Sequence, residues 1–429
     1  MASGAVMASG AVLAGLSIGS AAAQPAPPPP TTTTPAPFTT PNTDSCPNRS
    51  VPPPAVDLSE VPDPGETTPK PVPVPPQPIG GERMGECGVV LPDDAPPLPA
   101  DIAAPGWVLA DVDTGEVLAA KDPHGRYRPA STIKILLSLV ALDELDLNKT
   151  VTANAADAAM EGSAVGIGPN GRYTNMQLMQ GLVMASGNDA AHLIARQLGG
   201  SDETVEKMNA LAEELGALDT RTATPSGLDG PGMSSSPYDL ALIFHEAMKN
   251  PTFAKLISTE VVTFPGYPKN PAIPGDEDKP GFALGNDNRL LYNYPGAFGG
   301  KTGYTDDARH TYVGGAERDG RRLMVTLMGG EAKPLRPWEQ AARLLDYGFA
   351  LDAEPVGSLT ERPDEASADK AALLAAPPDA PDQPGGPVMA SGSDSPNSSL
   401  AERAGVGVIG TGVVIGLLGW ARRLNRGRR

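Results

Sequence analysis

The sequence predicts an α+β fold in which helices cover the faces of an antiparallel β-sheet and further helices form a subdomain. Patterns typical of β-strands open and close the central region, whereas the residues between them carry apolar side chains at helical spacing. Each strand-rich end also holds a tight turn, Asp113-Thr114-Gly115 and Arg318-Asp319-Gly320. Such turns favour hairpins, and hairpins make antiparallel sheets.

The first half of this region contains one hairpin and then helices. The hairpin is expected over Gly106–Ala120, where apolar residues flank the turn. A buried helix should begin near Ser131, because Pro129 suits the approach to a helix and the residues that follow are apolar almost all round. Two more helices are predicted over Asn175–Ser186 and Asn188–Leu198, and they meet at a Ser-Gly-Asn loop.

The second half returns from helix to strand. An amphipathic pattern predicts one helix, and a Pro in the first turn marks the start of the next. Three segments of β character follow, the last two joined by the second tight turn, and a final helix closes the region. In chain order these elements are expected over Asp202–Leu215, Pro237–Lys249, Ala297–Tyr304, His310–Ala316, Arg321–Met328 and Pro337–Phe349.

Composition separates a folded region from extended ends. The chain has 429 residues with 48 Pro and 49 Gly, and these concentrate toward both ends. A single folded domain is therefore expected over residues 104–352, after a Pro-rich N-terminal segment (24–103) and before a disordered Pro/Ala/Ser-rich linker (353–403). The net charge of −18 argues against a nucleic-acid partner.

Both ends of the chain carry targeting signals. Residues 1–23 are small and apolar and end in three Ala, which is typical of a signal peptide, although they contain no Lys or Arg. Residues 404–420 are uncharged and precede a basic tail (421–429), a pattern that predicts a transmembrane helix with a cytoplasmic tail. The tail also resembles a cell-wall sorting signal, but no Leu-Pro-x-Thr-Gly precedes it. We therefore expect an exported protein in the cell membrane, single-pass, with its folded domain outside the cytoplasm.

The two cysteines, Cys46 and Cys87, are expected to form a disulfide, because an exported protein with an even cysteine count usually pairs them. The bond would tie the Pro-rich segment to the folded domain and contribute about 3–4 kcal/mol through loop closure. No metal or other cofactor is predicted. The four histidines are dispersed and form no i,i+4 pair: His124, His192, His245 and His310.

Ser131 and Lys134 stand three residues apart at the start of the apolar helix. Positions i and i+3 share a helix face, so the two side chains can reach each other. A Lys at a buried helix start loses hydration and is easier to deprotonate, which would let it accept the proton of the Ser hydroxyl. A surface Ser beside a Lys with an exposed ammonium is the alternative, and this pair alone does not decide between them.

Three short motifs occur in order: Ser131-Thr-Ile-Lys134, Ser186-Gly-Asn188 and Lys301-Thr302-Gly303. Taken singly, the second reads as a helix cap and the third as a strand-end turn. Together, with the second in a helix–helix loop and the third on a strand, they indicate a nucleophilic serine enzyme.

The chain resembles the penicillin-binding, active-site-serine D-alanyl-D-alanine carboxypeptidases, also called low-molecular-mass penicillin-binding proteins. The resemblance covers about Ala104–Tyr347 and extends beyond the three motifs. It implies a β-lactamase/transpeptidase-like fold and a serine-type carboxypeptidase that trims the terminal D-Ala from peptidoglycan stem pentapeptides, with β-lactams as inhibitors. Further family-like stretches are Ser186-Gly-Asn-Asp-Ala-Ala191, Thr224-Pro-Ser-Gly-Leu-Asp229, Ser236-Pro-Tyr-Asp-Leu-Ala241 and Gly299-Gly-Lys-Thr-Gly-Tyr-Thr305.

The first two motifs would make and break bonds. Ser131 would form the acyl ester with Lys134 as general base, and Ser186 would relay the proton to the leaving amine. The Asn188 amide would hold Lys134 and the substrate backbone.

The third motif would bind substrate. Lys301 would add positive potential, the Thr302 hydroxyl would bind the terminal carboxylate, and Gly303 would let the substrate backbone lie close to the strand. By resemblance, the backbone N–H groups of Ser131 and Tyr304 form the oxyanion hole.

Two departures from the family pattern and two rival functions accompany this prediction. The segment Asp306–His310 differs from many relatives at the rim of the site, and a Pro-rich linker stands where many relatives carry a β-rich domain. A serine β-lactamase is one alternative, but the Glu-x-x-Leu-Asn pattern of class A enzymes does not occur between Asn188 and Lys301. A catalytically silent muropeptide-binding module is the other.

Overall fold

A computed structural model describes residues 39–360, and its centre is a seven-stranded antiparallel sheet. The strand order is β1-β3-β2-β10-β9-β8, and β11 also pairs with β3. The longest strands, β8, β9 and β10, stand at one end of the sheet. The two-residue strands β1 and β11 stand at the other end, where both pair with β3. The bounds are β1 Val89–Val90, β2 Gly106–Asp111, β3 Glu116–Lys121, β8 Ala297–Thr305, β9 Arg309–Arg318, β10 Arg321–Gly330 and β11 Gly357–Ser358.

Strand β10 divides its side chains between two hydrophobic cores, because successive residues of a strand point to opposite faces. Leu323, Val325 and Leu327 belong to the core that α9 (Pro337–Ala350) covers. Met324 and Met328 belong to the larger core on the other face, which α6 (Pro237–Met248) covers. The sheet is thus buried on both sides, as predicted.

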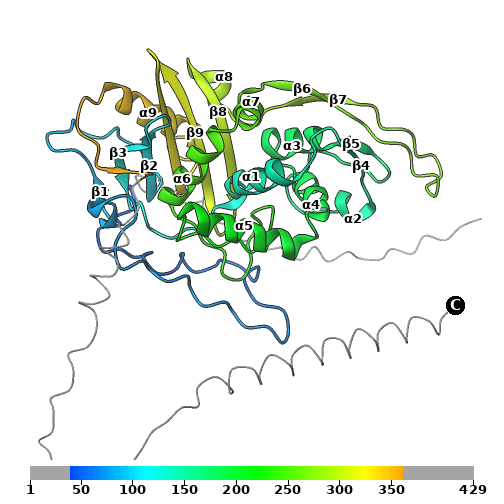
Figure 1. The fold of residues 1–429 in the computed structure, drawn as a ribbon, viewed down its shortest axis with the longest axis horizontal. Helices are drawn as coiled ribbons and strands as arrows, with labels where there is room; N and C mark the ends of the chain where they lie inside the picture. Colours follow the sequence, from blue (N-terminus) through cyan, green and yellow to red (C-terminus); the bar gives the residue numbers. More distant parts are fainter. Residues whose placement is uncertain (1–38, 361–429) are drawn as a thin grey trace, which may run out of the picture. The chain divides into compact units, whose positions relative to one another are not determined.

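The remaining helices build the predicted subdomain. In Figure 1, α1, α3, α4 and α5 gather on one side of the sheet, away from α9. Two pairs of antiparallel strands, β4–β5 and β6–β7, and the short helices α2 and α7 complete it, whereas the short helix α8 contacts β8 and α9. The bounds are α1 Lys134–Glu144, α2 Ala155–Ala158, α3 Asn175–Met184, α4 Asn188–Gln197, α5 Ser201–Leu215, α7 Pro251–Ser258, α8 Leu290–Asn293, β4 Thr150–Thr152, β5 Arg172–Thr174, β6 Val261–Phe264 and β7 Phe282–Gly285.

Each helix and strand that the sequence predicted within residues 39–360 is present, with ends that shift by a few residues. The caps explain where several helices begin. The Thr174 hydroxyl accepts from the Gln177 N–H at the start of α3, and the Ser236 hydroxyl accepts from the Asp239 N–H at the start of α6. The elements not predicted are α7, the strand pairs β4–β5 and β6–β7, and several very short pieces.

The described part of the Pro-rich segment (residues 39–103) packs on the domain instead of extending from it. Ile79, Met84 and Val90 are buried in the larger core. Cys46 and Cys87 form the predicted disulfide, with their Cα atoms 5.1 Å apart. The polypeptide between these cysteines, drawn in blue in Figure 1, is called the strap below.

The predicted signal peptide (1–23), the transmembrane helix (404–420) and the basic tail (421–429) lie outside the described residues, as does the linker beyond residue 360. Within residues 39–360, the structure contains no helix that is both long and apolar enough to cross a membrane.

Candidate active site

Ser131 and Lys134 meet as the sequence predicted, although the local structure differs. Ser131 lies in a 3₁₀ turn, η2 (Ala130–Ile133), and α1 begins only at Lys134. Side chains three residues apart eclipse one another in a 3₁₀ turn, and the Lys134 Nζ and Ser131 Oγ atoms are 2.8 Å apart. The preceding residue, Ala130, has a φ of 47°, a left-handed conformation that non-glycine residues adopt only where the surroundings enforce it.

The Lys134 amine is fully buried and has three oxygen partners. It contacts the Ser131 hydroxyl, the Asn188 Oδ1 atom at 2.7 Å and the Ser226 carbonyl. Burial, and then the positive charge of Lys301, hold the pKa of Lys134 well below its usual value. A neutral amine can donate to two of these oxygens and still present its lone pair to the Ser131 proton. The arrangement therefore suits a general base.

The Ser186-Gly-Asn188 motif lies in the predicted loop between α3 and α4, and Ser186 has a φ of 58°. Among residues 39–360 the Ser186 hydroxyl has no hydrogen-bond partner, so it is free for a substrate. The Asn188 side chain makes two contacts within the protein. Its Oδ1 atom holds Lys134 at 2.7 Å, and its Nδ2 atom donates to the Glu161 carbonyl at 2.6 Å. Its contact with the substrate backbone stays a prediction.

Asp189, to which sequence reasoning gave no role, fixes the loop that Asn188 contacts. Its carboxylate accepts from the backbone N–H groups of Val165, Gly166 and Ile167 at 2.8–2.9 Å. It stands in the first turn of α4, where a negative charge is favourable. This position was the sequence signal that could have identified Asp189. Asp189 therefore links the second motif to the loop before β5.

The Lys301-Thr302-Gly303 motif lies on β8, the edge strand beside the Ser131 turn. Lys301 is 1% exposed, and burial lowers the pKa of its amine while Asp287 raises it. Its Nζ atom donates to the Thr302 carbonyl at 2.8 Å, and the Thr302 hydroxyl donates to the Asp287 carboxylate at 3.0 Å. Asp287 had no motif to mark it and was missed.

Gly303 has a packing role within the protein that the sequence did not indicate, and its role toward the substrate stays a prediction. A Cβ atom at this position would lie 2.9 Å from the Ser131 nitrogen and 2.3 Å from the Thr311 Oγ1 atom. The hydrogen in place of a side chain therefore lets β8 approach the Ser131 turn itself, whatever it does for a substrate. The next residue, Tyr304, exposes its ring, and its hydroxyl donates to Asp306.

The strap reaches the rim of the site, which the sequence did not indicate. Glu60 forms an ion pair with Arg128, three residues before Ser131. Asp307, two residues after β8 ends, accepts from the Val56 N–H and, at 3.2 Å, from the Ser59 hydroxyl. The strap thus contacts two chain segments. One leads to the predicted nucleophile, and the other follows the third motif.

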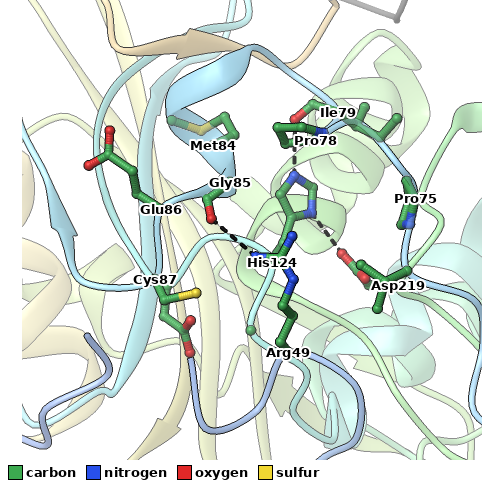
Figure 2. Close-up of a pocket in the computed structure, with 13 residues that line it drawn as sticks. Arg49, Pro75, Pro78, Ile79, Met84, Gly85, Glu86, Cys87, His124 and Asp219 are labelled. Atoms are coloured by element: carbon green, nitrogen blue, oxygen red, sulfur yellow. Dashed lines mark hydrogen bonds and ion pairs between the residues drawn. The ribbon is translucent and has the colours of Figure 1, made fainter. Parts of the chain in front are cut away.

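His124, Asp219 and Asp239 form a group of side chains that contacts Ile79 of the strap, and His124 and Asp219 line the pocket in Figure 2. The two ring nitrogens of His124 face the Asp219 carboxylate at 2.7 Å and the Ile79 carbonyl at 3.0 Å. Burial lowers the pKa of His124, but the Asp219 and Asp239 carboxylates and the Ile79 carbonyl together raise it above its usual value. The two acceptors also require two N–H groups on the ring. A doubly protonated ring has no lone pair for a metal. This group instead attaches the strap to the domain.

These features define a class of protein. A Ser–Lys pair beneath an edge strand, between an antiparallel sheet and a helical subdomain, is the arrangement of a serine-type acyl-transfer enzyme. Residues 93–332 match the sequence model of the D-alanyl-D-alanine carboxypeptidase family. The chain belongs to this family of serine peptidases.

Similar proteins agree with this assignment. The D-alanyl-D-alanine carboxypeptidase DacB2 of Mycobacterium tuberculosis is 50% identical over 275 residues, which cover 63% of this chain and 90% of that protein. DacF of Bacillus subtilis is 34% identical and covers 57% of this chain, which spans 61% of DacF.

Solved structures show the same fold. A D-alanyl-D-alanine carboxypeptidase from M. tuberculosis H37Rv aligns with a TM-score of 0.58 and 49% identity over 63% of this chain and 99% of that one. The Streptomyces K15 DD-transpeptidase aligns with a TM-score of 0.54 and 30% identity over 60% of this chain and all of that one. The β-lactamase/transpeptidase-like fold that the sequence predicted is confirmed.

Proposed function

We propose that this protein is a serine-type carboxypeptidase that removes the terminal D-Ala from peptidoglycan stem pentapeptides through an acyl-enzyme and is inhibited by β-lactams. The observation that carries the proposal is the 2.8 Å contact between Ser131 and a fully buried Lys134 whose pKa is lowered. The family and the relatives' names support the substrate class.

The Ser131–Lys134 contact and the resemblance of the three motifs support the following reaction steps. Lys134 takes the hydroxyl proton as the Ser131 oxygen attacks the carbonyl carbon between the two D-alanines. The oxyanion is stabilised by the N–H groups of Ser131 and Tyr304, each worth about 3–4 kcal/mol. The C–N bond then breaks, and the leaving amine receives its proton through Ser186. Water afterwards adds to the ester carbonyl, and the Ser131 oxygen leaves with a proton.

Product analysis with a pentapeptide stem tests this function. The enzyme should release one D-alanine and leave a tetrapeptide. Labelling with a fluorescent penicillin separates the rival functions, because the label should be long-lived for a carboxypeptidase, transient for a β-lactamase and absent for a silent binding module. No release of D-alanine would contradict the proposal.

The pH dependence should report the Lys134 amine. Only the neutral amine accepts a proton, so kcat/KM should rise as pH increases through the pKa of Lys134. Since the Lys301 charge lowers that pKa, Lys301→Gln should raise it and move the acid limb of the profile to higher pH. Lys301→Arg keeps the charge and should leave the limb in place. An acid limb that does not move in Lys301→Gln would show that it reports another group.

Thr302 and the substrate carboxylate can be tested together. A charge-assisted hydrogen bond is worth about 1.5–3 kcal/mol, so Thr302→Val and C-terminal amidation of the peptide should each lower kcat/KM by about ten- to a hundredfold. The two changes combined should lower it by less than the product of the single losses. Strictly multiplicative losses would show that the Thr302 hydroxyl does not contact the carboxylate.

We further propose that the enzyme is exported and held on the outer side of the cell membrane by residues 404–420. The uncharged run and the Arg-rich tail behind it support this location. Deleting residues 401–429 should release an active enzyme into the soluble fraction. Fractionation that finds the truncated protein still on membranes would place the anchor elsewhere.

A further inference from the structure

The donors expected to bind the substrate carboxylate already hold a carboxylate of the protein itself. The Asp287 Oδ2 atom accepts from the Thr302 hydroxyl at 3.0 Å and lies 3.8 Å from the Lys301 Nζ atom. One oxygen thus meets the same hydroxyl and the same cation that the proposed function assigns to the C-terminus of the peptide.

The loop that carries Asp287 is firmly placed. Asn286 donates to the carbonyls of Ile257 and Thr259, and the buried Asn288 accepts from the Tyr312 hydroxyl at 3.0 Å. The two asparagines point into the protein and are almost fully buried, whereas the Asp287 side chain between them is 35% exposed. The loop therefore fixes the backbone of Asp287 and leaves its side chain able to rotate into solvent.

Two carboxylates cannot share this position favourably. A second negative charge at the same hydroxyl would be repelled by Asp287 at short range, and Thr302 has only one proton to donate. Rotation of the Asp287 side chain frees both donors without moving the loop. The apparent affinity for the substrate carboxylate then falls as the fraction of molecules with Asp287 in the site rises.

We propose that Asp287 is a specificity-determining residue that occupies the carboxylate-binding donors of the free enzyme and must rotate away before a peptide with a free C-terminus binds. The proposal rests on the proposed function, because it uses the same Thr302 and Lys301 donors. It concerns the KM for carboxylate substrates and gives Asp287 no part in the bond-making step.

The test compares two peptides that differ only at the C-terminus. With the free carboxylate, Asp287→Ala should raise kcat/KM by about three- to tenfold, mostly through a lower KM. With the C-terminal amide, which has no charge to compete with Asp287, kcat/KM should not change. Asp287→Asn, which keeps the size of the side chain and loses its charge, should behave like Asp287→Ala and decides the matter if the Ala variant is unstable.

The matched control is Asp306→Asn, which removes the charge of an exposed acid. Asp306 directly follows β8, the strand that carries Thr302, but it contacts the Tyr304 hydroxyl and not Thr302. The substitution should leave kcat/KM for the free peptide unchanged. An equal rise in Asp306→Asn would mean general charge repulsion and would overturn the proposal. So would a fall or no change in the Asp287 variants, or an equal rise with the amidated peptide. D-alanine release by the wild-type enzyme in this assay tests the proposed function separately.

Discussion

Ser131→Ala is expected to abolish both D-alanine release and covalent labelling by penicillin while the domain stays folded. The Ser131 oxygen is the only hydroxyl oxygen that contacts the buried Lys134 amine in the described part of the chain. Without it no ester can form, so kcat should fall by about 10⁴-fold or more. Labelling, product analysis and thermal unfolding measure the three parts of this expectation.

Ser138→Ala is the matched control. Ser138 lies on α1, the helix that begins at Lys134, is fully buried and donates to the Lys134 carbonyl at 2.7 Å, but it does not reach the amine. Its replacement should lower stability by about 1 kcal/mol and leave labelling intact. A Ser131→Ala protein that still binds penicillin covalently would show that the nucleophile is another residue.

Gly303→Ala is expected to have the next largest effect, although it adds a single methyl group. The new Cβ atom would lie 2.9 Å from the Ser131 nitrogen and 3.1 Å from the Ala130 Cβ atom, both on the turn that carries the nucleophile. The turn and β8 would have to separate. Misplacement of reacting groups by about 1 Å lowers rates on the order of a hundredfold, so acylation by penicillin should slow by at least that much.

Gly285→Ala provides the comparison, because Gly285 ends strand β7 and a Cβ atom there meets nothing within 4 Å. It should acylate at the wild-type rate. Gly303→Ala should also unfold at a lower temperature, since overpacking typically destabilises by about 1–3 kcal/mol. Wild-type acylation by Gly303→Ala would mean that the Ser131 turn tolerates the shift and that the contact does not position the nucleophile.

Local sequence signals sufficed for the elements that frame the site. The turn residues specify the hairpins β2–β3 and β9–β10, and helical spacing of apolar residues specifies α1 and α3 to α6. The i,i+3 spacing of Ser131 and Lys134 also brings them together whether that turn is α or 3₁₀, because both helices place such residues on one side.

The missed elements had weak local signals. In β6, Val261 is 57% exposed, so the strand lacks the one-sided burial that produces an alternating pattern. Helix α7 has only eight residues, too few to show helical periodicity clearly, although Asn250 caps it and Pro251 begins it. Strands β1 and β11 have two residues each and exist only because β3 offers free backbone groups to pair with.

The sequence by itself determined the family fold, the order of the three motifs and the pairing of Ser131 with Lys134, because these depend on neighbours along the chain. Only the tertiary structure decided what surrounds them. Asp287 meets Thr302, and Glu60 on the strap meets Arg128, across separations that no local pattern records. Likewise, Gly303 is required by the turn that packs against it. Contacts between distant segments arise only once the sheet and the helices have packed, and the sequence does not display them beforehand.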